Sequence, residues 1–264
     1  MKLNTLKVML AAGLVMSGMA TAAENAGPFF TPAQEKRIGE VAKEYLMSHP
    51  EILVQVSQKL QMQQQEDTLK AMTSAVIKNQ SALLNDKGTP SYGPVNAQVT
   101  VVEFFDYQCI YCARQAPELE KVIKSNPQVR FIFKEWPIFG KRWDNSLLAA
   151  KTGLQVWQQK GAEAYLKYHN ALYATAHNEG TLTAEDISAA AKTVQFDVRT
   201  APPVQDTLSG INQLAQQLGF SGTPAMVVMP AAGAATDNVT VLPGFSSAVT
   251  LQAAIEKASG GVKK

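Results

Sequence analysis

The sequence has little of the material from which several common kinds of site are built. Its 264 residues include only two cysteines and three histidines, too few cysteines for a disulfide-rich scaffold or a four-sulfur zinc site. The 24 basic and 22 acidic side chains give a formal net charge of +2, which offers no electrostatic reason to expect a nucleic-acid partner. No Gly-rich phosphate loop, serine triad or internal repeat stands out. The remaining composition, 46% hydrophobic and 17% charged residues, is typical of a globular protein of one or two domains.

The chain opens with the composition of a cleavable export signal. Lys2 and Lys7 supply positive charge, and residues 8–19 form an apolar segment shorter than the roughly 20 residues of a transmembrane helix. Small side chains at residues 20–22 follow, as a cleavage site requires. We therefore expect residues 1–22 to be removed and the mature protein to be exported to a compartment where disulfides persist.

Residues 23–90 carry helical patterns and no strand signal. After an expected N-cap at Thr31, apolar residues recur at the spacing of one helix face: Ile38, Val41, Ala42, Tyr45 and Leu46. A second stripe starts near Glu51 and lapses over residues 61–67, which predicts a kink. The stripes are too small to close a core, so they must bury against the rest of the chain or a second copy. We expect a homodimer or a trimer, followed by a Gly/Pro-rich linker.

Beyond residue 90 the pattern changes to alternating strands and helices. Strands are predicted over residues 99–105, 129–135, 225–229 and 239–242, and helices over residues 111–125 and 248–258. A long helical insertion is predicted over about residues 141–218, with breaks at Gly161, residues 178–180 and residues 202–203. This order predicts an α/β domain at residues 91–264, with a mixed sheet and an inserted helical subdomain.

The two cysteines, Cys109 and Cys112, lie directly after a predicted strand and at the start of a predicted helix. The N–H groups and dipole of a helix N-terminus stabilise an anion, which favours Cys109 as a thiolate. The two-residue spacing lets Cys112 attack a mixed disulfide formed at Cys109 and so release the partner. The pair therefore predicts thiol–disulfide exchange.

Other uses of a cysteine pair fit less well. A zinc site would need two more ligands, and His169 and His177 are too far apart in sequence for the usual spacing. A c-type haem needs a histidine after the second cysteine, where this chain has Ala113. A purely structural disulfide stays open, although so short a loop closes little chain entropy.

Two segments make the sequence recognisable. Residues 102–112, VEFFDYQCIYC, resemble the active-site segment of the DsbA family of periplasmic thioredoxin-fold oxidoreductases. Residues 222–228, GTPAMVV, resemble the cis-proline loop and following strand of that family. The resemblance runs from about Val95 to the C-terminus, and the N-terminal helices resemble those of Com1-like, oligomeric members. It implies a thioredoxin fold with an inserted helical subdomain, and an enzyme whose redox group is the Cys109–Cys112 disulfide, without a further cofactor or a metal.

The resemblance also implies roles for particular residues. Cys109 matches the nucleophile and Cys112 the buried resolving thiol. Pro224 matches the cis-proline that faces the disulfide, and the backbone of the preceding Thr223 is available to pair with an extended substrate peptide.

A charged pair is implied as well. Glu103 falls where the family has a buried acid near the resolving cysteine, and Lys134 falls where a neighbouring strand carries the partner of that acid. A glutamate flanked by Val102 and Phe104 in a core strand is costly unless it is paired or transfers protons. A solvated position at the sheet edge is the alternative.

Two departures from the family leave the direction of the reaction open. Ile110 and Tyr111 separate the cysteines, without the histidine of strongly oxidising members, so we expect the Cys109 pKa to be lowered, but not to the floor of the range of about 3.5–7.5. Thr223 replaces the valine of plain oxidases and looks more like the isomerase branch.

The resemblance thus implies an oxidase, an isomerase or both, acting on unfolded or misfolded exported proteins with a membrane redox partner. A periplasmic thiol reductase is one alternative. A non-enzymatic holdase or surface protein with a structural disulfide is the other.

Overall fold

The computed structural model describes residues 29–197 and 202–260, and the expected export signal lies outside them. The chain divides into two compact units, Met1–Leu60 and Gln61–Lys264. The division falls inside helix α2 (Glu51–Lys78), well before the linker predicted near residue 90. The reason is that Met72, Val76 and helix α3 (Gln80–Leu84) pack into the core of the second unit.

Helix α1 (Pro32–Ser48) begins where the sequence predicts. Thr31 and Gln34 form a capping box, in which the Gln34 N–H donates to the Thr31 hydroxyl and the Thr31 N–H donates to the Gln34 side chain. No residue of α1 is buried. Six apolar side chains on the predicted stripes are each between 48% and 58% exposed: Ile38, Val41, Tyr45, Leu53, Val56 and Leu60. The first unit therefore presents an apolar stripe that is half exposed among the residues that the structure describes.

Helix α2 is continuous from Glu51 to Lys78, so the kink predicted over residues 61–67 is wrong. Most residues in that stretch are glutamine, methionine and glutamate, which are good helix formers. Glu66 also pairs with Lys70 one turn later, at 2.7 Å. An apolar stripe reflects what packs against a helix, so a gap in the stripe does not require a break in the helical backbone.

The second unit is built on a five-stranded sheet in the order β1-β3-β2-β4-β5. Its strands are β1 (Ser91–Tyr92), β2 (Val99–Phe105), β3 (Arg130–Glu135), β4 (Ala225–Pro230) and β5 (Thr240–Pro243). The central pair, β2 and β3, is parallel, and the other pairs are antiparallel. Helix α4 (Ile110–Ser125) connects β2 to β3. This is the mixed α/β sheet that the sequence predicts.

Alternate side chains of the sheet face two different cores. Val101, Phe105 and Phe133 pack with helices α4, α5 (Asp144–Ala174) and α8 (Ala248–Ala258). Val102 and Phe104 pack on the opposite face, with α3, α7 (Gln205–Gln217) and the end of α2. Neighbouring residues on one strand therefore experience different surroundings, which decides the roles of two charged residues described below.

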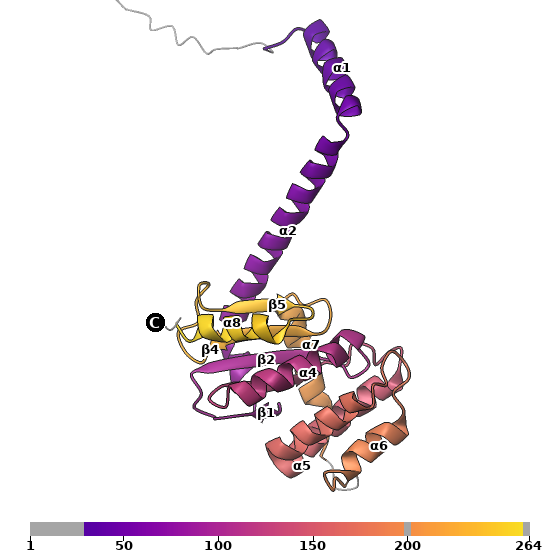
Figure 1. Cartoon of the computed structure of the whole chain (residues 1–264), viewed down its shortest axis with the longest axis vertical. Helices are drawn as coiled ribbons and strands as arrows, with labels where there is room; N and C mark the ends of the chain where they lie inside the picture. The colour runs from indigo at the N-terminus through magenta and orange to yellow at the C-terminus, as the bar shows by residue number, and fades with distance from the viewer. Residues whose placement is uncertain (1–28, 198–201, 261–264) are drawn as a thin grey trace, which may run out of the picture. The chain divides into compact units, whose positions relative to one another are not determined.

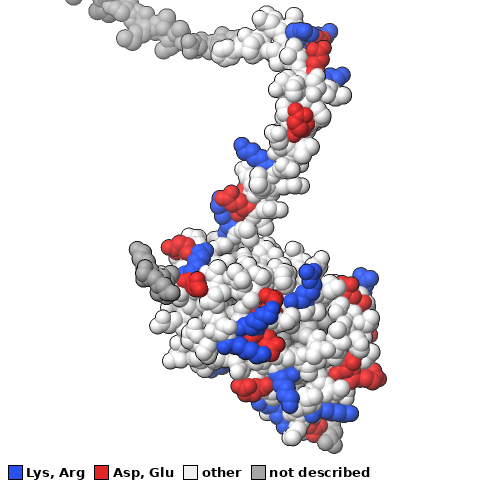
Figure 2. Space-filling view, in the orientation of Figure 1, with Lys and Arg blue, Asp and Glu red and all other residues white. Residues whose placement is uncertain are grey.

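The chain between β3 and β4 forms the expected helical insertion, in which α5 and α6 (Ala184–Lys192) pack together (Figure 1). Helix α5 is interrupted at Gly161, as predicted. On the face drawn in Figure 2, acidic and basic side chains are interspersed over the second unit, in keeping with the small net charge. Within residues 29–197 and 202–260, no helix combines the length and hydrophobicity needed to cross a membrane.

Candidate active site

The cysteine pair lies at the junction of β2 and α4. Cys109 is the N-cap residue of α4, with an extended backbone (φ −83°, ψ 119°). Its N–H donates to the Asp106 carbonyl at 3.0 Å, and its carbonyl accepts from the Ala113 N–H at 3.0 Å. Both cysteines are free thiols, 3% exposed at Cys109 and 1% at Cys112. The local strand–cysteine–helix arrangement is therefore the one predicted from the sequence.

The loop before β4 faces this pair. The Thr223–Pro224 peptide bond is cis, as expected. In its protonated form, the Cys109 thiol donates to the Thr223 carbonyl oxygen, which lies 3.2 Å from the sulfur. The Pro224 carbonyl in turn accepts the Gly244 N–H at 2.8 Å, which ties the loop to the segment after β5. Residues more than a hundred positions apart in sequence thus meet at one sulfur.

The two thiols have opposite acidities. The pKa of Cys109 is lowered to about 6, first by a hydrogen bond from the Cys112 thiol and then by the backbone N–H groups of Cys112 and Tyr111, against the opposing effect of burial. The pKa of Cys112 is raised well above its ordinary value, first by burial and then by its interactions with Cys109 and Glu103. Near neutral pH, Cys109 is therefore mainly a thiolate and Cys112 a thiol.

Glu103 lies in β2 beneath the cysteines and is 3% exposed. Within the described part of the chain, its Oε2 atom has no hydrogen-bond partner. Burial, and secondarily the charge of Cys109, raises the pKa of Glu103 to about 8. Glu103 also acts on Cys112, since its charge raises the pKa of that thiol. The solvated alternative for Glu103 is excluded, and its carboxyl group can gain or lose a proton near neutral pH.

Lys134 is not the partner of Glu103, and the predicted pairing is wrong. Glu103 lies in register with Phe133 on the parallel strand β3, so Lys134, the next residue, points to the opposite face. There its ammonium group donates to the Asp86 carboxylate at 2.9 Å and to the Thr89 hydroxyl at 3.0 Å. Lys134 therefore joins the sheet to the segment after α3 and lies away from the cysteines.

Glu135 is a second buried acid, and it has no predicted role. It projects from the same face of the sheet as Glu103, two residues after Phe133. The hydroxyls of Tyr107 and Tyr165 donate to its Oε1 atom at 3.0 and 2.8 Å. Burial raises its pKa well above the ordinary range. The two-residue period of β3 could have placed Glu135 on this face, but only with the strand register known.

Partly exposed apolar side chains lie beside the cysteines. Ile110 is 39% exposed, Tyr111 54% and Phe245 42%. The Arg114 guanidinium lies over the rings of Tyr111 and Phe245, 5.8 and 5.4 Å from their centroids. We call Ile110, Tyr111, Arg114 and Phe245 the apolar rim. In the ranges that the structure describes, no group of three or more acidic, histidine or cysteine residues is arranged to hold a metal ion.

The geometry of the site agrees with comparisons to known families. The family model described as thioredoxin matches residues 84–229, more than half of the chain. The chain belongs to the thioredoxin family. A second model, described as the copper resistance protein ScsC N-terminal domain, matches residues 34–66. No curated protein matches the sequence.

Solved structures show the same relationship. Salmonella enterica Typhimurium BcfH is 43% identical, with a TM-score of 0.77 over 86% of this chain and 97% of that chain. A thioredoxin-like oxidoreductase from Silicibacter pomeroyi is 33% identical, with a TM-score of 0.57 over 69% and 98%. Proteus mirabilis ScsC in a transitional conformation is 29% identical, with a TM-score of 0.59 over 88% and 98%. The predicted thioredoxin fold and the predicted class, a DsbA-like thiol–disulfide oxidoreductase, are thereby confirmed.

Proposed function

We propose that this thioredoxin-family protein forms and rearranges disulfides in unfolded or misfolded exported proteins in the periplasm, with the Cys109–Cys112 pair as its redox group and no other cofactor. The observation that carries the proposal is the contrast between the two thiols. The pKa of Cys109 is lowered to about 6, whereas that of buried Cys112 is raised. In such a pair, one sulfur exchanges with the substrate as a thiolate, and the other stays protonated until it resolves the mixed disulfide.

In the oxidising direction, a substrate thiolate attacks the Cys109 sulfur of the protein disulfide. The Cys109–Cys112 bond breaks, a mixed disulfide forms, and Cys112 takes up a proton. A second substrate thiolate then attacks the substrate sulfur, forms the substrate disulfide and releases Cys109 as a thiolate. The two electrons remain on the protein as a dithiol until a membrane redox partner removes them. The lowered pKa makes Cys109 a good leaving group in the second step.

In the isomerising direction, the Cys109 thiolate attacks a wrong disulfide in the substrate. The freed substrate thiolate attacks another substrate disulfide, and a final exchange releases Cys109 unchanged. If the substrate does not break its mixed disulfide with Cys109, Cys112 attacks that disulfide, and the proton of the Cys112 thiol must leave. Glu103 is suited to accept that proton and to return it in the oxidising direction, because its carboxyl group is buried, lacks a partner at Oε2 within the described residues, and has a pKa of about 8.

The loop and the apolar rim supply a surface for substrate. The backbone of Thr223 lies at the Cys109 sulfur, where an extended peptide carrying the reacting cysteine would pair with it. The side chains of that peptide would then contact Tyr111 and Phe245, which are half exposed. An unfolded chain offers both an extended backbone and apolar side chains, whereas most folded proteins offer neither.

The first unit is proposed to hold two or three copies together. Its exposed stripe includes Val41, Leu53 and Val56, each about half exposed. Burying such side chains between copies stabilises an assembly by at most about 1.5–3 kcal/mol each, before association entropy is subtracted. An oligomer would present more than one Cys109 to the same misfolded substrate, which favours isomerisation.

Light scattering tests this assembly. The full chain should run as a dimer or trimer. The double variant Val41→Lys with Leu53→Lys should dissociate it. The control Lys43→Gln, on α1 like Val41, should not. A monomeric wild-type chain would remove the oligomer and the argument for isomerisation. Truncation is a poorer test if it begins near residue 91, because it removes Met72 and Val76 from the core of the second unit.

Three assays decide the function: oxidation of reduced ribonuclease, refolding of scrambled ribonuclease and reduction of insulin, each repeated with Cys109→Ala. We expect the wild-type protein to oxidise and refold ribonuclease and the variant to do neither. Insulin reduction without either ribonuclease activity would identify a reductase. Activities that Cys109→Ala leaves unchanged would show that the cysteine pair is only structural.

A further inference from the structure

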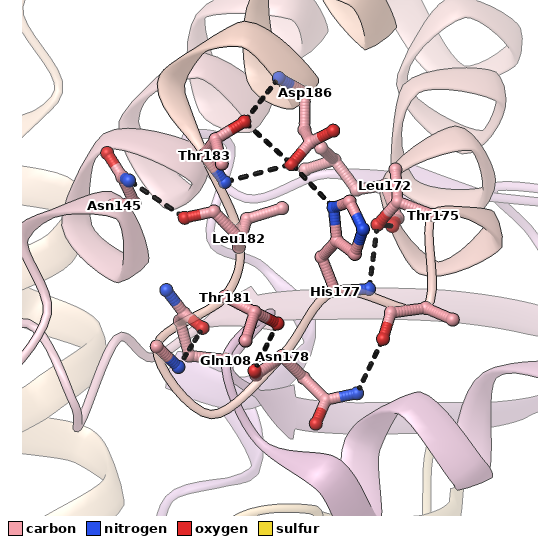
Figure 3. A network of polar contacts seen from close by, with 12 residues as sticks. Gln108, Asn145, Leu172, Thr175, His177, Asn178, Thr181, Leu182, Thr183 and Asp186 are labelled. Atoms are coloured by element: carbon pink, nitrogen blue, oxygen red, sulfur yellow. Dashed lines mark hydrogen bonds and ion pairs between the residues drawn. The ribbon is translucent and has the colours of Figure 1, made fainter.

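Gln108, the residue before the nucleophile, is held by a loop of the helical insertion (Figure 3). The Gly180 N–H donates to the Gln108 Oε1 atom at 2.8 Å, and the Glu179 N–H donates to the Gln108 carbonyl at 2.9 Å. On the other side, the Gln108 N–H donates to the Asp106 Oδ1 atom at 2.8 Å. Gln108 is 1% exposed. Its backbone and side chain are therefore both fixed by segments that come from two parts of the fold.

The loop at residues 175–183, between α5 and α6, is itself closely tied (Figure 3). The Thr181 hydroxyl donates to the Asn178 carbonyl at 2.7 Å. The Asn145 amide of α5 donates to the Leu182 carbonyl at 2.8 Å. Hydrogen bonds within the loop and to α5 fix its course, so it can hold another residue in place.

The far end of the loop is anchored on α6. Thr183 and Asp186 form a capping box, and the Asp186 carboxylate also contacts the His177 ring at 2.8 Å. This contact, together with the Thr183 hydrogen bonds, lowers the pKa of Asp186 to about 2. His177, near the start of the loop, is thus joined to Asp186, in the first turn of α6.

Gly180, which donates to Gln108, sits in a backbone conformation and a space that suit glycine. Its φ is +96°, a conformation that residues with a side chain rarely adopt. A Cβ atom at this position would lie 2.8 Å from the Trp143 Nε1 atom. A side chain here would press on the Trp143 ring and strain the backbone at residue 180, whose N–H is one of the two that hold Gln108.

We propose that Gln108 is a positioning residue, through which the 175–183 loop holds Cys109 at the N-terminus of α4 and its sulfur against the Thr223 loop. The inference rests on the proposed function and deepens it. Cys109 is the N-cap of α4, and the donors to its thiolate include the Tyr111 and Cys112 N–H groups. Stabilisation by these groups depends on where the sulfur lies and fades within the first helical turn. Holding residue 108 therefore controls the acidity of the residue that follows.

The test compares Gln108→Ala and Gly180→Ala with the wild-type full chain. Each protein is reduced, the rate of Cys109 alkylation by iodoacetamide is measured against pH, and the labelled residue is identified by mass spectrometry. Both variants should titrate at a higher pH than the wild type. A helix-terminus effect changes an acid constant about two- to fivefold. Because about half of Cys109 is ionised at pH 6 in the wild type, the alkylation rate at that pH should fall about 1.5- to threefold. If Gln108→Ala does not fold, Asn145→Ala loosens the same loop at Leu182 and should give a smaller shift in the same direction.

Gln80→Ala is the matched control. The Gln80 amide also donates to two backbone carbonyls, Pro230 and Ala231, each at 3.1 Å, but at the end of β4 away from Pro224. It should lower Tm and leave the alkylation profile unchanged. The positioning role is overturned if the loop variants lower Tm as Gln80→Ala does and keep the wild-type profile. Failure of the proposed function would show itself separately, as a wild-type protein inactive on ribonuclease.

Discussion

Glu103 and Lys134 are ionisable residues on adjacent central strands, 3% and 0% exposed, and yet their surroundings are opposite. Lys134 faces the α3 side, where Asp86 and Thr89 hydrogen-bond its ammonium group. Glu103 faces the α4 side, where its Oε2 atom has no partner in the described part of the chain. A buried charge with partners supports the fold, whereas a buried acid without them is poised to change its protonation state. Burial alone would have given both residues the same role.

The largest difference between the two residues should appear in the kinetics. Glu103→Gln keeps the shape of the side chain but removes its titrating proton. We expect Cys112 to resolve a mixed disulfide about a hundredfold more slowly in this variant, and Lys134→Met to leave the rate within about twofold, because general acid–base catalysis needs a group near the reacting thiol. Stopped-flow release of a model peptide at pH 7 measures both rates. An unchanged rate in Glu103→Gln would show that the carboxyl group takes no part in the proton transfer.

Substitution of Lys134 should lower the free energy of unfolding more than substitution of Glu103 does. Lys134→Met leaves Asp86 without its cation, and we expect it to lower the free energy of unfolding by about 3 kcal/mol, the lower end for a broken buried pair, since the Asp86 side chain is 35% exposed. Urea melts at pH 7 measure this loss, with exposed Lys121→Met as the control. A Lys134→Met variant as stable as the wild type would mean that the pair contributes nothing.

The pH dependence of stability sharpens the contrast at Glu103. Its pKa is raised to about 8 in the folded protein from an ordinary value of 4.5. The stability that the bound proton confers is complete below the unfolded pKa and is lost as pH rises through the folded value. Glu103→Gln lacks this loss, so its advantage over the wild type should grow between pH 5 and pH 8, by on the order of 3 kcal/mol. Urea melts across this range that run parallel for the two proteins would contradict a buried, protonated Glu103.

A smaller effect is expected at the sulfur on the same side of the sheet. The pKa of Cys109 is lowered to about 6 from 9.0, so the thiolate adds stability that is fully present above the unfolded pKa and is lost as pH falls through the folded value. The reduced protein should therefore be more stable than the disulfide form at pH 7, by about 1 kcal/mol, and the preference should weaken at pH 4. Paired urea melts at both pH values measure it. A disulfide form that is the more stable at both would favour a reductase.

Local structure in the second unit could be predicted well from the sequence, because each helix and strand has its own local sequence pattern. The run at residues 99–105 is β2, and the closing helix occupies residues 248–258 as expected. The apolar, β-branched strand residues and the Gly and Pro breaks between helices act over a few residues. The same holds for Cys109 and Cys112, whose position between strand and helix follows from neighbouring residues alone.

Features that depend on distant residues could not be predicted in this way. The face on which Lys134 lies follows from the register of β3 against β2, and a shift of one residue reverses it. The Gly/Pro-rich segment near residue 90 suggested a boundary, but α3 before it is buried in the same core as the sheet. The contact of Gly180 with Gln108 joins residues 72 apart, and neither residue carries a local sign of it.

Cys109 should react while Cys112 stays protonated, and brief alkylation of the reduced protein distinguishes the two thiols. Iodoacetamide is applied at a series of pH values from 4 to 9, and mass spectrometry locates the label. We expect label on Cys109 almost alone, with a rate that titrates near pH 6. Equal labelling of Cys109 and Cys112, or a rate that rises only near the ordinary thiol pKa of 9.0, would contradict this difference between the thiols.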